Sequence, residues 1–237
     1  TSNVSGTIDK LTFDEIDLTL DTTRLTGAMV YWPGTEPHIN LDFELSRLDL
    51  DSYLPALSER LAVLRSGVNA ENGGADATWS PTSDFASVLS GIETQVDMSV
   101  GSVIIAGNVL RDVRLSAASE RGSISVTTFS VDDFLGARLS ASGSVSNLEG
   151  TAKVDTLVME LEAQEFLRVG RSLDLNLPQL PLLSGPLSIK LQLSGTLQNL
   201  SGTADARLSN LALSAVGNVS AKYPDLSMVA QVNLSHP

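Results

Sequence analysis

The sequence predicts an all-β, mainly antiparallel fold with one or two short helices. Three features support this prediction: apolar residues alternate with small polar ones at a period of two, turn residues separate these runs, and one eleven-residue segment occurs twice. Such repetition is typical of stacked β-units that bury their apolar faces against one another. We therefore expect an elongated, repetitive, curled sheet or groove, with a closed β-sandwich as the alternative.

Alternation at a period of two is the dominant pattern along the chain. The clearest runs occupy residues 39–45, 113–117, 124–126, 173–177 and 187–193. Turn signals lie between them, such as Glu120-Arg121-Gly122 and Ser184-Gly185-Pro186. Strands spaced in this way without intervening helices pair antiparallel, with one apolar face.

The repeated segment reads Ser-Gly-x-x-x-Asn-Leu-x-Gly-Thr-Ala. It occupies residues 142–152 and recurs 52 residues later at 194–204, and a shorter echo lies at residues 5–7. Each copy joins two alternating runs, so we interpret it as a link that carries a turn.

In three places the alternation of apolar and polar residues shifts by one residue. The slips run from Leu45 to Leu48, from Val154 to Leu157 and from Leu208 to Leu211. A slip turns every later side chain to the other face unless a bulge absorbs it. We expect a β-bulge, or a strand that crosses between two sheets, at these points.

The chain divides into three predicted parts. Residues 1–66 form an N-terminal β segment that ends in an amphipathic helix, with Leu54, Leu57, Leu61 and Leu64 on one face. The glycine-rich residues 67–82 form a flexible linker, and residues 83–237 form a repetitive β domain that we expect to continue beyond this sequence. A second short helix is predicted at 83–89.

Composition excludes several kinds of function. The net charge of −13 leaves no basic stripe for nucleic acid and argues against docking on an anionic lipid surface. The chain has no cysteine, which excludes thiol catalysis and Cys-zinc sites. No apolar run reaches the roughly 18 residues of a membrane-spanning helix.

The two histidines give no sign of catalysis. His38 lies among prolines and glycine, where we expect a surface loop, and His236 lies almost two hundred residues away. Neither stands near a recognisable nucleophile motif, and no phosphate loop or dinucleotide glycine pattern occurs. We therefore expect no catalytic residues and no cofactor.

The carboxylates also favour structural roles. Asp49 and Asp51 are predicted to share a solvated strand face, while Asp132 and Asp133 precede a turn. The linker residues Glu71, Asn72 and Asp76 lack the spacing of a calcium loop, so we expect no metal site.

Four segments resemble the AsmA-like proteins of Gram-negative bacteria. Residues 107–115 match a strand of the form Gly-x-x-Leu-x-x-Val-x-Leu, residues 122–126 follow a glycine hairpin, and residues 134–143 match the return strand. Residues 48–55 are similar to the family's Asp-Leu-Asp-x-Tyr-Leu element. The chain departs from the pattern at Ala137, where the family has a second glycine, and in its Gly/Asn-rich linker.

The resemblance implies a non-enzymatic periplasmic protein of outer-membrane biogenesis, tethered to the inner membrane by an anchor outside these residues. Its partners would be phospholipid or another acyl-chain lipid, together with envelope proteins. The implied site is a β-groove with an apolar floor, which the alternation could supply. The lining residues that we predict are Val113, Leu115, Ile124, Val126, Leu139, Val145, Leu187, Ile189, Leu191 and Leu193.

Two other classes of function stay open at this point. A structural β-repeat, serving as a spacer or adhesion module, would pack the same inward residues into a filled core. A carboxylate-dependent hydrolase would need two carboxylates about 5–10 Å apart in a cleft.

Overall fold

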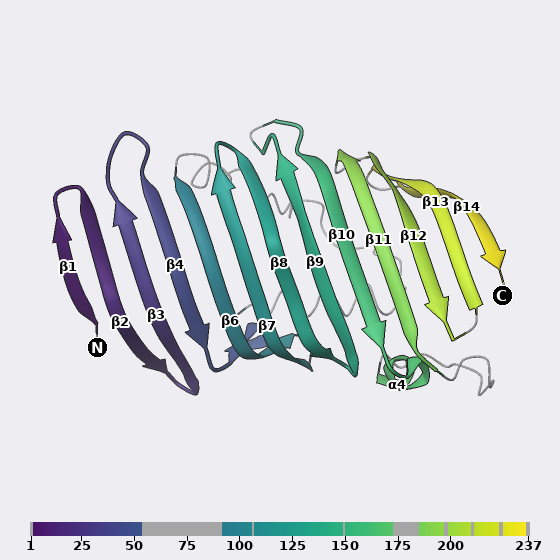
Figure 1. Cartoon of the computed structure of the whole chain (residues 1–237), viewed down its shortest axis with the longest axis horizontal. Helices are drawn as coiled ribbons and strands as arrows, with labels where there is room; N and C mark the ends of the chain where they lie inside the picture. Colours follow the sequence, from purple (N-terminus) through teal and green to yellow (C-terminus); the bar gives the residue numbers. More distant parts are fainter. Residues whose placement is uncertain are drawn as a thin grey trace, which may run out of the picture.

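A computed structural model describes residues 2–53, 92–105, 107–148, 150–172, 185–196, 199–209, 211–222 and 225–235. In this part of the chain one continuous sheet holds all 14 strands, and it is not closed (Figure 1). β1 and β14 form its two opposite edges. The predicted all-β, mainly antiparallel sheet is confirmed, and the alternative of a closed sandwich is wrong for the described residues.

The strands follow one another across the sheet almost in chain order. Their bounds are β1 Asn3–Thr7, β2 Lys10–Leu20, β3 Thr23–Trp32, β4 His38–Leu45, β5 Leu48–Asp49, β6 Glu93–Ile105, β7 Asn108–Glu120, β8 Ser123–Phe134, β9 Ala137–Ser146, β10 Lys153–Ala163, β11 Leu187–Thr196, β12 Asn199–Leu208, β13 Leu211–Lys222 and β14 Asp225–Ser235. Hairpins join most neighbours, which is the connection that antiparallel strands allow.

The only parallel pairing of the described strands lies where β6 meets β4 and the short β5. The short helix α1, Leu50–Tyr53, follows β5 directly. The predicted helices at 54–64 and 83–89 and the predicted linker lie outside the described residues, as does the alternating run 173–177. The strands before and after that linker lie side by side in one sheet.

Strand register sorts the side chains onto two faces. Because paired residues point to the same side, one row can be followed across the sheet. This row contains Leu41, Val96, Ala117, Val126, Gly143, Leu157, Leu193, Gly202 and Gly217. The next row on the same face contains Phe43, Met98, Leu115, Phe129, Ala141, Met159, Leu191, Ala204 and Ala215. Both rows are apolar throughout, so one face of the sheet is apolar.

The slip at Leu45 is shared by neighbouring strands. The chain leaves β4 at Leu45 and resumes pairing in β5 at Leu48, in the same sheet and with the same partner strand β6. The neighbouring strands show the same three-residue spacing of apolar residues, from Val100 to Val103 in β6, from Leu110 to Val113 in β7 and from Val131 to Phe134 in β8. All eight of these residues pack in one cluster. The strands therefore change phase together, which keeps their apolar residues on one side.

The other two slips have different structures. Val154 to Leu157 is a β-bulge, as predicted, because the register of β10 shifts there against both β9 and β11. The bulge predicted between Leu208 and Leu211 is wrong. These two residues pair with each other across the β12–β13 hairpin, and Ser209 has a positive φ of 51°, as a tight turn requires.

The repeated motif forms hairpins at one edge of the sheet. Its first copy ends β9 and leads into β10, and its second copy ends β11 and leads into β12. Because β9 and β11 run in the same direction, both links lie at the upper edge in Figure 1, as does the β1–β2 hairpin that carries the shorter echo. The interpretation as turn-bearing links is confirmed.

The second helix, α4, spans Phe166–Ser172 at the lower edge of the sheet (Figure 1). Val169 packs in a buried cluster with Ala137, Ala163 and Leu187, and Phe166 contacts this cluster. Burial of these side chains favours a helix here, although the sequence analysis placed its helices elsewhere.

Candidate functional site

The candidate site is the apolar face of the sheet. All ten residues predicted to line a groove lie on this face, as the register pairs connect them from β7 to β11. Val113 and Leu187 are buried in two separate packed clusters, and the other eight are partly exposed. Their assignment to a lipid site stays a prediction, but their common placement is a property of the fold.

One end of the apolar face is tightly packed, and the other end contains a cavity. Towards the lower edge, Val131 and Val100 are only 0% and 2% exposed, in the cluster that also contains Val113. Towards the hairpin edge, β7, β8, β9 and β10 line a cavity of about 260 Å³. The lining residues of this cavity are Leu115, Ile124, Val126, Phe129, Ala141, Ser142, Gly143, Ser144, Val145, Val154 and Leu157.

The cavity lies along β9, between two register shifts. In β8 the register against β9 shifts between Val126 and Phe129, and in β10 it shifts between Val154 and Thr156. Bulges bend a strand and increase its local twist. The central strand offers only small side chains between these bends, namely those of Ala141 and Gly143. The cavity therefore forms because β8 and β10 bend on either side of β9, and because β9 has no large side chain between these bends.

The bulge of β10 carries a side-chain contact to β9. Asp155 lies within the bulge, and its hydrogen bond with the side chain of Ser146 holds the pKa of the carboxyl below its ordinary value. Lys153, whose Nζ lies 3.3 Å from the Asp155 carboxylate, lowers this pKa further. The Asp155 carboxylate thus connects the bulge of β10 to Ser146 at the end of β9.

Sequence reasoning missed several lining residues. Phe129, Ala141, Gly143, Val154 and Leu157 belong to the cavity but were not predicted as lining. A signal was present for Phe129, because Thr127 and Thr128 separate it from Val126 and mark a further phase slip. The glycine and alanine of β9 gave no signal, since small residues in a strand do not look like the floor of a site.

The opposite face is polar and carries ion pairs between strands. Asp132 bridges two arginines, with Arg114 Nη1 at 3.1 Å and Arg138 Nε at 3.5 Å. Lys190 Nζ lies 2.7 Å from Glu160 Oε1 on the neighbouring strand. Exposed cross-strand pairs of this kind contribute little to stability. Their charges nevertheless favour the exposure of this face to solvent.

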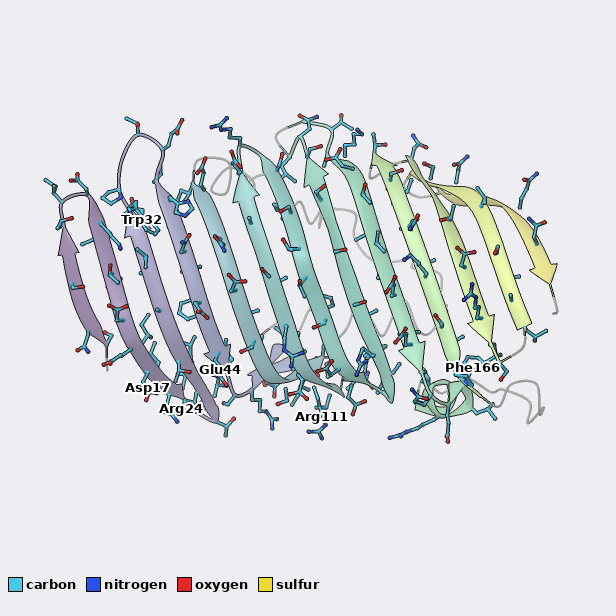
Figure 2. The ribbon with its side chains drawn as sticks, viewed as in Figure 1. Asp17, Arg24, Trp32, Glu44, Arg111 and Phe166 are labelled. Carbon is cyan, nitrogen blue, oxygen red and sulfur yellow. The ribbon has the colours of Figure 1, made fainter. Side chains whose placement is uncertain are left out.

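Arg24 and Asp17 form a pair with two hydrogen bonds on this face. Arg24 donates two hydrogen bonds to the Asp17 carboxylate, at 3.0 Å from Nε and 2.8 Å from Nη2. These bonds lower the pKa of Asp17 and raise that of Arg24. Figure 2 shows both residues near the lower ends of β2 and β3, away from Trp32 at the upper end.

The carboxylates considered for chemistry have structural partners. Asp49 and Asp51 do not share a strand face, because the chain turns into α1 between them. Asp49 Oδ1 accepts a hydrogen bond from the Ser52 amide at 3.1 Å, and Asp51 Oδ2 accepts one from the Gly107 amide at 2.8 Å.

The predictions for Asp132 and Asp133 and for His38 have opposite outcomes. Asp133 Oδ1 accepts a hydrogen bond from the Gly136 amide at 2.8 Å, so Asp132 and Asp133 do precede a turn. His38 does not lie in a surface loop. It is the first residue of β4, where its ring tilts against Trp32 at 5.1 Å.

Across the described residues, no group of three or more His, Cys, Asp or Glu side chains is placed to hold a metal ion. In the same part of the chain, neither helix is long and apolar enough to cross a membrane. Glu71, Asn72, Asp76 and His236 lie outside the described residues. No protein-family model, curated protein or solved structure matches the chain.

Proposed function

We propose that this chain is a lipid-shielding segment of an AsmA-like protein, which holds acyl chains of phospholipid on the apolar face of its sheet. In this proposal the protein acts without catalysis in outer-membrane biogenesis. It works in the periplasm, tethered to the inner membrane through a part outside these residues, and it cooperates with other envelope proteins.

One observation carries the proposal: on one face of the sheet, two apolar rows run without interruption from β4 to β13, and the sheet is not closed. The two rows from β4 to β13 contain no charged or hydrogen-bonding side chain. Large apolar surfaces of this kind mark sites of interaction with proteins, membranes or ligands. The resemblance of residues 107–143 to AsmA-like strands favours lipid among these ligands.

The negative charge of the chain favours a protein that shields lipid over one that adheres to a membrane surface. With a net charge of −13, the protein is repelled by anionic headgroups. An acyl chain lying along the two apolar rows meets no such repulsion, because these rows contain no charged side chain. Lipid would thus be held by its tail.

The proposal is tested by lipid that co-purifies with the chain. We expect mass spectrometry of organic extracts to detect phospholipid on the wild type after expression in a Gram-negative periplasm. Leu191→Glu places a charge on the apolar face and should reduce this lipid, whereas Gln192→Glu, one residue away on the opposite face, should not. Far-UV circular dichroism shows whether both variants keep the sheet. A wild type without bound lipid would contradict the proposal.

A structural repeat is the second candidate, and the tight packing around Val131 and Val100 favours it. If the function is only to space or connect, the apolar face is a core and takes up no lipid. The same extracts therefore decide between the two candidates.

A further inference from the structure

The cavity between β7 and β10 differs from the rest of the apolar face. Here two bends and a floor of Ala141 and Gly143 leave a hollow of about 260 Å³ with an apolar lining. The hollow extends along the strand direction, from Ala141 to Val145 of β9. At about 3.3 Å per residue, these four steps measure about 13 Å.

We propose that this cavity is a discrete binding site for one unbranched alkyl chain, held parallel to the strands with its polar end at the hairpin edge. The proposal rests on the proposed function, and it adds a location, an orientation and a stoichiometry of one chain at this site.

The lining selects an occupant without polar groups. No lining side chain is charged, and outside the two register shifts the backbone groups of β8, β9 and β10 pair within the sheet. A polypeptide segment placed in the cavity would leave its own amides without partners, which is costly away from water. An alkyl chain has no such groups and gains from every buried methylene.

The orientation follows from what lies at each end. Phe129 lines the lower end and packs against the cluster of Val100 and Val131, so this end is blocked. At the other end, Ile124 and Val154 are close to the turns that contain the exposed side chains of Arg121 and Asn147. A methyl end thus fits against Phe129, and a carboxylate or headgroup reaches solvent at the hairpins.

Two neighbouring residues of β9 provide a matched test. Ala141→Phe fills the lower end of the cavity, and Ser140→Phe adds the same ring to the opposite, polar face of the same strand, outside the cavity. Palmitate binding to the full chain is measured by displacement of cis-parinaric acid. We expect Ala141→Phe to weaken binding by about tenfold or more, the effect of excluding about two methylenes, and Ser140→Phe to leave it unchanged.

The outcomes separate this inference from the proposed function. Equal binding by the wild type and Ala141→Phe, or equal loss in both variants, overturns the cavity as the site while leaving lipid binding elsewhere on the face. If the wild type binds neither palmitate nor phospholipid, the proposed function fails as well.

A second measurement uses only the wild type, so it does not depend on how the variants fold. Palmitate with a diazirine at its methyl end should crosslink near Leu115 and Phe129, and a diazirine close to the carboxylate should crosslink near Ile124 and Val154. The reverse pattern overturns the orientation, and crosslinks confined to other strands overturn the site.

Discussion

Gly143 of β9 lies directly against the backbone of Thr156, which belongs to the bulge of β10. A Cβ atom at Gly143 would collide with the carbonyl oxygen of Thr156. The glycine therefore has two effects: it permits the bulge to form beside it, and it leaves the floor of the cavity without a side chain.

Gly143→Ala should therefore destabilise the protein. We expect a loss of about 1–3 kcal/mol in the free energy of unfolding, because either the bulge or the strand has to move. Urea unfolding followed by circular dichroism measures this loss. Gly34→Ala is the control, since a Cβ at Gly34 meets nothing within 4 Å, and its effect should stay within about 0.5 kcal/mol. Equal effects of the two substitutions would argue against the close approach.

Truncation of Val131 tests the packed end of the apolar face. Val131 is 0% exposed, so Val131→Ala should cost about 2 kcal/mol through lost burial and the cavity that remains. Val216 is 58% exposed, so the same substitution there should change unfolding little. If Val131→Ala is as mild as Val216→Ala, this end of the face is not a packed core.

The Asp17–Arg24 pair predicts a dependence on pH. Its hydrogen bonds lower the pKa of Asp17 in the folded state below its ordinary value of 3.8. The resulting stabilisation is fully present above the unfolded pKa and is lost as the pH falls through the lower, folded pKa. Carboxyl ¹³C NMR titration should show this low pKa, and Arg24→Gln should return it towards 3.8. A pKa of Asp17 that is the same in both proteins would refute the assignment. Both side chains are largely exposed, so added salt should weaken the effect.

The sequence predicted the strands better than it predicted their connections. Alternation is a local property, so β7, β8 and β11 could be recognised from their own residues. The parallel pairing of β4 with β6 joins segments far apart in the chain, and no local sequence pattern predicts it. The end of β12 was also predicted wrongly, because Leu208 and Leu211 pair across a hairpin whose Ser209 takes a positive φ without being glycine.

For the candidate site, the sequence predicted the apolar face but not the cavity on it. The apolar face follows from alternation, so all ten predicted residues could be placed on it. The cavity could not be predicted, since it needs bulges in β8 and β10 to lie on either side of the small residues of β9. Only the structure sets these three strands side by side.

The most direct test of the central claim is photo-crosslinking from neighbouring positions on the two faces of β11. A benzophenone amino acid is placed at Leu193 or at Gln192, and the protein is irradiated in the periplasm of a Gram-negative cell. A lipid-bearing apolar face predicts phospholipid adducts from Leu193 and none from Gln192. Adducts from neither position, or from both equally, would contradict the claim that lipid lies on one face of this sheet.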